Sequence, residues 1–413
     1  MQPNTNVQTL RGTALRALLI ASLASALLFP PILIHDGWPK AELSDLLLPF
    51  TALAVLLVAL KNQRDSRFSA LRNPLAAVAL FVLVIVLSMA VNNRLTVARD
   101  WLEVVKFTKF CVLLIGFTLA FTVGKLRQVF LFLAPLVVAF NALHFFDVLG
   151  FNQWVEPFYA PKVHLDVFGY DSEGNPGTRR IMGSMGNPNV NALMFLYLLI
   201  AIAPGERLSK RNTGLTLALV FVLILGVMLS QSRTAVVALA VVILVYGFVF
   251  SKRKRMLLGI AAFSVFAFFL MEWIGNTYLV TIVDPNRLER SGNLRFAQWQ
   301  RIIDAMPGKW LLGNAPSKEY FEANGIYSES EYFLILFRYG FVGLLAMAAF
   351  GLSLLLNAVK QKGQSRFILL AGSGVYLLSA ATNNPLHSMK LALVIAAVLA
   401  LGLVSLTENE AEA

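Results

Sequence analysis

The chain has 413 residues, of which 57% are hydrophobic and only 14% charged. Because ordinary soluble domains carry about 25% charged residues, this composition excludes a water-soluble globular protein. The net charge of +12 comes from basic residues scattered over many loops, whereas a nucleic-acid-binding protein needs one contiguous basic face, so we expect no nucleic-acid partner.

The apolar stretches predict an all-α, polytopic membrane protein with about twelve transmembrane helices, since roughly 20 apolar residues cross a bilayer as a helix. The first stretch is followed by Pro30 and Pro31 and lacks a small-residue cleavage site, so we interpret it as retained. One integral membrane domain, residues 1–413, is expected. The predicted spans are residues 14–34, 43–60, 74–91, 101–121, 129–147, 189–204, 213–230, 234–250, 256–273, 332–356, 366–384 and 389–406.

The basic residues of the short loops predict the orientation. Lys and Arg recur in alternate loops, near residues 61–72, 125–127, 207–211, 252–255 and 360–366. If these loops are cytoplasmic, as the positive-inside rule requires, both termini are cytoplasmic too. The two long loops, 147–188 and 276–331, then lie together on the external side.

The fourth predicted span begins with charged residues. Helical spacing puts Glu103, Lys106 and Lys109 on one broad face. That face either lines a hydrated cleft or pairs its charges at the membrane interface, and the sequence leaves both interpretations open.

The second external loop contains an amphipathic helical pattern over Asn293–Met306, with Arg295 and Arg301 on its polar side. We expect this helix to lie on the outer membrane face. Arginine binds phosphate through two parallel hydrogen bonds. The loop's Arg287, Arg290 and Arg295 are therefore candidates for binding a lipid phosphate or its glycan.

Two shorter motifs place further arginines at the same surface. Arg179 and Arg180 precede Asn187, a predicted N-cap with Pro188 at the first helical position and Asn189 after it. Such a helix end attracts anions, although a capped helix beside interfacial arginines would look the same.

The other motif is Ser230-Gln231-Ser232-Arg233, which must form a tight hairpin between two spans. An arginine at its tip either snorkels to the interface or points into a pocket, where Ser232 would accompany it.

The end of the second external loop supplies carboxylates. Glu331 comes directly before Tyr332 and Glu329 two positions earlier, and both precede Arg338 by about two helical turns or more. Carboxylates near arginines act as general bases or simply pair with them. Cys111 is the chain's one cysteine and the four histidines are widely separated, so we expect no metal and no cofactor.

In order and spacing, Asn187-Pro188-Asn189, Ser230-Gln231-Ser232-Arg233, Glu329-Ser330-Glu331-Tyr332 and Tyr339-Gly340 resemble the O-antigen ligase and polysaccharide polymerase superfamily. The resemblance implies a GT-C-like multi-span fold in the bacterial inner membrane. It also implies metal-independent transfer of an undecaprenyl-diphosphate-linked glycan at the periplasmic face. Arg233, with Arg179 or Arg180, would contact the diphosphate.

The acceptor divides this superfamily. Ligases that transfer to lipid A-core show a His-Asn pair before the glycine that matches Gly340, whereas this chain has Glu329-Ser330 there. The resemblance therefore favours the polymerase branch, whose acceptor is another lipid-linked glycan, and leaves the ligase as an alternative. Glu329 is the first candidate for the catalytic base and Glu331 the second. A glycolipid transporter is a further alternative, and membrane lipids are expected partners.

Overall fold

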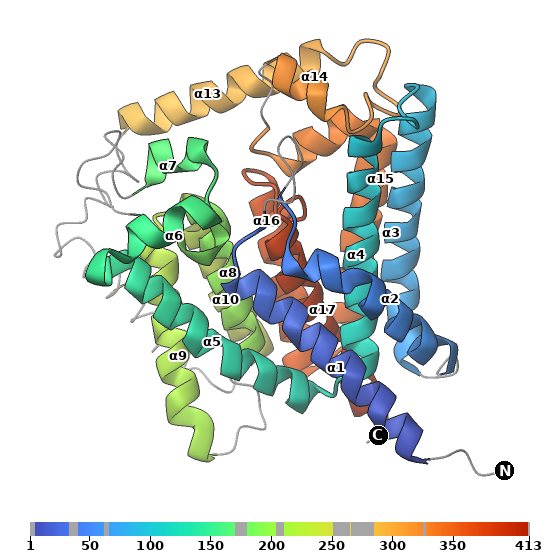
Figure 1. Cartoon of the computed structure of the whole chain (residues 1–413), viewed down its shortest axis with the longest axis vertical. Helices are drawn as coiled ribbons and strands as arrows, with labels where there is room; N and C mark the ends of the chain where they lie inside the picture. The colour runs from blue at the N-terminus through green and yellow to red at the C-terminus, as the bar shows by residue number, and fades with distance from the viewer. Residues whose placement is uncertain are drawn as a thin grey trace.

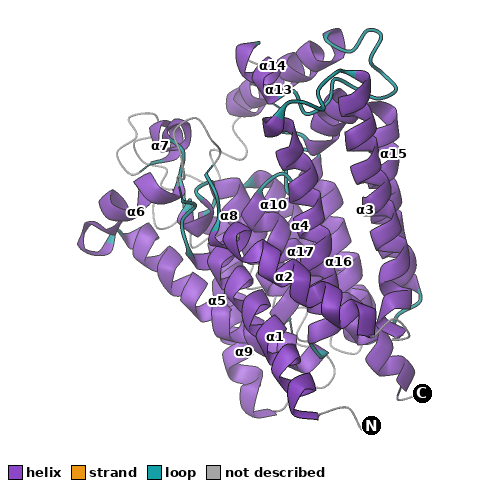
Figure 2. Cartoon of the chain, turned by 45° about the vertical axis from the view of Figure 1, so that its right-hand side comes forward, coloured by secondary structure: helices purple, strands orange, loops and turns teal. Residues whose placement is uncertain are grey.

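The computed structural model shows a helical protein (Figure 1, Figure 2). It describes residues 5–32, 40–61, 66–169, 180–203, 210–250, 265, 285–324 and 328–411. Helices form nearly all the regular structure in these ranges, with one isolated bridge between Ile32 and Ala41. The all-α prediction is confirmed for this part of the chain.

The long helices of the first half are α1 (Thr5–Leu28), α2 (Leu43–Lys61), α3 (Ser66–Val91), α4 (Ala98–Ala120), α5 (Val123–Phe146), α8 (Pro188–Ile202), α9 (Lys210–Leu229) and α10 (Arg233–Val249). The C-terminal part contributes α15 (Glu331–Val359), α16 (Gly363–Ala380) and α17 (Met389–Ala411). A helix therefore overlaps every predicted span except 256–273, of which only residue 265 is described.

Two predicted boundaries are wrong. The first helix ends at Leu28 rather than at residue 34, because Pro30 and Pro31 cannot continue a helix and restrict the residue before them. Likewise α16 ends at Ala380 rather than at residue 384. Residues 381–388 therefore form a loop between α16 and α17.

By length and composition, α2, α3, α5 and α15 are apolar enough to cross a bilayer, whereas the described apolar parts of α1, α8, α9, α10 and α17 are shorter. Large apolar side chains stay exposed along the outer helices, such as Phe50 on α2, Phe248 on α10 and Leu345 on α15. Exposed apolar surface of this extent needs an apolar solvent. The protein is therefore a membrane protein, while the number of twelve crossings stays a prediction.

The core is built around α17. Residues 391–404 are buried on every side, since α17 packs against α4 and α16 and also touches α8, α1, α3 and α5. Around it, α15 packs along α3, and α10 along α16. A helix that is apolar all round belongs inside such a bundle.

Both predicted external loops contain helices. The first loop forms α6 (Phe151–Tyr159), α7 (Lys162–Phe168) and the short 3-10 helix η2 (Gly183–Met185), and the second forms α13 (Pro285–Asp304) and α14 (Lys318–Ala323). Figures 1 and 2 show α7, α13 and α14 at the end of the molecule opposite the first turns of α1 and the last turns of α17, with α6 below α7. The prediction that the two loops share a side agrees with this arrangement.

The predicted amphipathic helix is confirmed as α13, which begins at Pro285, earlier than expected. It extends across the end of the bundle in Figure 1. Its C-terminal part is docked: Ile302 is buried with Phe337 of α15, and Trp299 stacks on Phe333 at a centroid distance of 4.7 Å. Leu294, in contrast, is 61% exposed.

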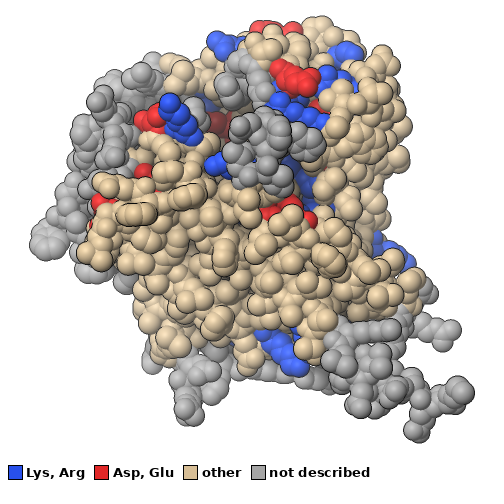
Figure 3. All heavy atoms as spheres, viewed as in Figure 1, with Lys and Arg blue, Asp and Glu red and all other residues tan. Residues whose placement is uncertain are grey.

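Charged side chains are also concentrated at the end of the molecule where α13 and α14 lie (Figure 3). On the face drawn in Figure 3 they gather towards the end that α13 and α14 form, and a broad zone below carries almost only uncharged side chains. This is the distribution expected of a protein whose middle lies in a bilayer.

A glycine divides α15 into two parts. Gly340 has φ 63° and ψ −163°, a conformation essentially restricted to glycine. The segment before α14 packs into the break, where Trp310 O accepts a hydrogen bond from Phe341 N at 2.9 Å and Asn314 N donates one to Phe337 O at 2.8 Å. A Cβ at Gly340 would overlap the Leu311 carbonyl oxygen. Glu331 and Arg338 therefore lie on a separately oriented first part of α15.

Candidate functional site

The first arginine motif folds as a capped helix start. Asn187 Oδ1 accepts hydrogen bonds from Asn189 N at 2.9 Å and Val190 N at 3.2 Å, and Pro188 begins α8. The predicted N-cap is confirmed. Arg180 lies beside this helix end and donates from Nη2 to Asn189 Oδ1 at 2.9 Å.

Arg180 also joins this motif to the hairpin between α9 and α10. Its Nε donates to Ser230 O at 3.1 Å, and its Nη2 lies 3.3 Å from Gln231 O. Gln231 has a positive φ of 51°, so the turn is as tight as predicted. Arg233 is half-buried in the first turn of α10, preceded by the buried Ser232 as N-cap.

The hairpin in turn contacts the loop between α16 and α17. The hydroxyl oxygens of Thr234 and Thr382 are 2.5 Å apart, and Asn383 Nδ2 donates to Thr382 Oγ1 at 3.2 Å. Asn383 O accepts from the backbone N of Glu331 at 3.1 Å. The arginine hairpin and the start of α15 therefore meet at this loop.

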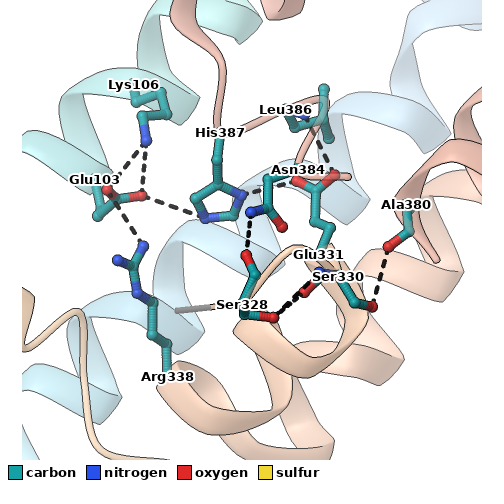
Figure 4. A network of polar contacts seen from close by, with 10 residues as sticks. All are labelled: Glu103, Lys106, Ser328, Ser330, Glu331, Arg338, Ala380, Asn384, Leu386 and His387. Atoms are coloured by element: carbon teal, nitrogen blue, oxygen red, sulfur yellow. Dashed lines mark hydrogen bonds and ion pairs between the residues drawn. The ribbon is translucent and has the colours of Figure 1, made fainter. Parts of the chain in front are cut away.

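Glu331 is completely buried and bonds to the same loop (Figure 4). Its Oε1 lies 2.8 Å from His387 Nδ1, and its Oε2 accepts from Leu386 N at 3.3 Å. The neighbouring Ser330 Oγ donates to Ala380 O at 3.2 Å. The carboxylate is thus held by side-chain and backbone donors.

His387 lies between Glu331 and a second buried carboxylate, that of Glu103 on α4 (Figure 4). Its Nε2 is 3.6 Å from Glu103 Oε2. Glu103 is surrounded by basic side chains: Lys106 Nζ at 3.0 Å, Lys318 Nζ at 3.2 Å and Arg338 Nη1 at 3.5 Å from its Oε1.

The structure bears on both interpretations of the start of α4. Glu103 pairs with Lys106 at 3.0 Å, as one interpretation expects, but it is only 1% exposed and so lies in a buried polar site. The prediction of one shared face is wrong for Lys109. Its Nζ instead lies 2.6 Å from Asp45, in the first turn of α2, and 3.3 Å from Glu42, directly before that helix.

The site has more basic than acidic groups. Lys106, Lys318 and Arg338 surround Glu103, while Glu331 is the only other carboxylate drawn in the network of Figure 4. Burial lowers the pKa of His387 from its ordinary value, and the hydrogen bond to Glu331 opposes that shift only in part. With His387 neutral, the excess positive charge favours an anionic ligand.

Other predicted site residues lie around this cluster. Glu329 is exposed and pairs with Arg295 of α13, whose Nε is 2.8 Å from Glu329 Oε2. Tyr332 donates its hydroxyl to Leu377 O at 2.6 Å. Arg179 lies outside the described residues. For Arg287 and Arg290 the structure describes the backbone, as part of α13, but not the side chains.

Sequence reasoning missed part of the site. It named Glu103 and Lys106 as a charged face but did not connect them with the arginine motifs. It missed Lys318 and the segment that contains Thr382, Asn383 and His387. For the last segment a signal exists, because Asn383, Asn384 and His387 are polar residues packed between two apolar spans.

A comparison with known protein families covers the second arginine motif and the start of α15, but not the Asn187 motif. A protein-family model described as O-antigen ligase matches residues 218–348, a stretch that includes the arginine hairpin, α13, α14 and the first half of α15. No curated protein matches the chain.

Proposed function

We propose that the chain elongates a cell-surface polysaccharide, because residues 218–348 match the protein-family model described as O-antigen ligase and the motifs resemble the O-antigen ligase and polysaccharide polymerase superfamily. The donor is an undecaprenyl-diphosphate-linked glycan, and the acceptor is a sugar hydroxyl of a second lipid-linked glycan. The reaction takes place at the periplasmic face of the bacterial inner membrane, inverts the anomeric configuration and needs no metal.

One observation supports this proposal most directly: the Thr234–Thr382 hydrogen bond joins the arginine hairpin to the loop that holds Glu331 and His387. Glycan transfer from a diphosphate carrier requires cations at the leaving group and a proton acceptor at the attacking hydroxyl. Both kinds of residue occur here in one connected site.

Arg233 and Arg180 are assigned to the donor diphosphate. Negative charge develops on the leaving diphosphate as its bond to the anomeric carbon breaks, and arginines held in place stabilise that charge without reorganising. Arg180 is held by Ser230 O, Gln231 O and Asn189 Oδ1. Removing one such fixed contact costs about a hundredfold or more in rate.

Glu329 is assigned to orienting Arg295 instead of accepting the proton, since the two form an exposed ion pair at 2.8 Å. The sequence favours a polymerase because Glu329-Ser330 replaces the His-Asn pair of the ligases. The amphipathic helix α13 roofs the site and contacts the glycan.

The test is a reconstituted reaction. The purified chain is incubated with undecaprenyl-diphosphate oligosaccharide, alone or with lipid A-core, and the products are resolved by mass. We expect products longer by whole repeats without lipid A-core, and a loss of about a hundredfold in Arg233→Ala. Arg72→Gln, an exposed arginine near the start of α3, is the matched control and retains activity.

Two other outcomes contradict the proposal in different ways. Glycan found only on lipid A-core makes the protein a ligase. Donor that binds but is never transferred, and that crosses the bilayer in sealed vesicles, makes it a transporter.

A further inference from the structure

His387 and Glu331 form a buried hydrogen-bonded pair to which the proposed glycan transfer assigns no role. Both Glu331 oxygens accept hydrogen bonds from the loop between α16 and α17, and the residue has no exposed surface. Glu331 therefore has no outward oxygen for an acceptor sugar. Nε2 of its partner His387 makes no hydrogen bond, although Glu103 Oε2 lies 3.6 Å from it.

The hydrogen bond defines the tautomer of His387. A carboxylate only accepts hydrogen bonds, so His387 Nδ1 must carry the proton that bridges the 2.8 Å to Glu331 Oε1. In the neutral imidazole, Nε2 then has its lone pair free. Nε2 is buried and has no hydrogen-bond partner, an unusual state for a buried polar atom.

Resting on the proposed function, we propose that His387 is the catalytic base of the transfer and Glu331 its positioning residue. The acceptor hydroxyl binds at Nε2. As its oxygen forms a bond to the anomeric carbon, its proton moves to Nε2, and the bond from the anomeric carbon to the diphosphate oxygen breaks. The leaving undecaprenyl diphosphate keeps that electron pair, and the proton later passes from Nε2 to water.

The surrounding charges suit this role. The groups that face the ring are Glu331 on α15 and Glu103 and Lys106 on α4, with Phe107 edge-on at 5.9 Å. Before the transfer, burial keeps the imidazole neutral. After it, the imidazolium lies between two carboxylates that stabilise its charge, the relationship that makes a histidine base effective.

Side-chain exposure rises from 1% at Glu103 to 11% at Lys106 and 20% at Lys318. Lys318 belongs to α14, at the end of the molecule where α13 lies (Figure 1). The proposal requires the acceptor to approach from this side, and a lysine side chain is long and flexible enough to move aside for it.

The experiment measures kcat and KM against pH for the native chain, His387→Gln and Glu331→Gln, together with donor binding. The native kcat should fall at low pH, as Nε2 becomes protonated. His387→Gln should lower kcat by about 10²–10⁴-fold, leave donor binding intact and lack that acid limb. Glu331→Gln should lower kcat about tenfold or more and move the acid limb to lower pH, since Glu331 raises the pKa of His387.

The matched control is His144→Gln. It removes another buried His–Glu contact, 3.2 Å from His144 Nε2 to Glu156 Oε1, away from this site, and should keep the native pH profile. If the role of His387 were merely structural, His387→Gln would lower stability but keep the acid limb of kcat. If His387→Gln does not fold, the shift in Glu331→Gln carries the test.

The two proposals fail differently. Native-like kcat in His387→Gln, or an unmoved acid limb in Glu331→Gln, overturns the assignment of the base while the glycan transfer stands. Absence of transfer by the native chain overturns the proposed function, and this assignment with it.

Discussion

Thr234 and Thr382 bring their hydroxyl oxygens within 2.5 Å of each other, across 148 residues of sequence. Thr234 belongs to the first turn of α10, next to Arg233, and Thr382 follows α16. This contact sets the distance between the arginine hairpin and the loop that holds Glu331. The relative position of leaving group and proton acceptor therefore depends on it.

Thr382→Val keeps the shape of the side chain and removes this hydrogen bond. We expect kcat to fall between about tenfold and a hundredfold, because small displacements of reacting groups cost that much. Donor binding should change little, since the arginines stay. Ser353→Ala, which loses a hydrogen bond of 2.7 Å to Phe350 O far along α15, is the control. Equal rates in both variants contradict the expected coupling.

Arg180→Lys tests whether the guanidinium shape is required. A lysine ammonium cannot reach Ser230 O, Gln231 O and Asn189 Oδ1 together. A hydrogen bond from a charged group contributes about 1.5–3 kcal/mol, so we expect a lower unfolding temperature and donor binding at least about tenfold weaker. Thermal unfolding in detergent and a donor titration measure the two effects. Unchanged binding would remove Arg180 from the diphosphate site.

The lowered pKa of His387 predicts a pH dependence of stability. In the unfolded chain this histidine takes up a proton at a higher pH than in the folded protein. Between the two pKa values the unfolded state binds more protons, so stability falls as the pH drops below the ordinary histidine value of about 6.5.

The measurement compares unfolding temperatures at about pH 7.5 and pH 5.5. The native chain should lose more stability on acidification than His387→Gln, which lacks the titrating group. Equal losses would mean that the pKa of His387 is the same in the folded and the unfolded chain.

Two substitutions in α13 separate docking from exposure. Ile302→Ser places a hydroxyl where Ile302 is fully buried against Phe337, so it should detach α13 from α15 and abolish transfer while the chain still inserts. Leu294→Ser, at a position 61% exposed, should leave docking unchanged. Limited proteolysis and the transfer assay read out both variants. Full activity in Ile302→Ser argues against a roof over the site.

The features that sequence reasoning predicted correctly are local. The N-cap of α8 follows from Asn187 and Pro188 in adjacent positions, and the hairpin before Arg233 follows from two apolar runs joined by a very short polar turn. The helix α13 follows from periodicity alone. In each case, all the information lies within about one or two helical turns.

The features it missed depend on distant packing. Glu103 and His387 are 284 positions apart and meet only because α17 packs against α4. The choice between Glu329 and Glu331 depends on where α15 begins: Glu331 is its first residue and points inward, whereas Glu329 lies before it and reaches Arg295. Helix ends are the least certain part of any sequence-based assignment.

The break at Gly340 has a consequence for chimeric proteins. The backbone of Trp310 and Leu311 bonds to Phe341 and Val342, the groups that an unbroken helix would bond internally. The loop before α14 and the break in α15 are thus one structural unit, although about thirty positions of sequence separate them, enough for some eight turns of helix. A loop transplanted from a relative without the matching stretch of α15 would leave those amides unpaired and reorient Arg338. A chimera meant to change the donor or acceptor preference should therefore exchange both segments together.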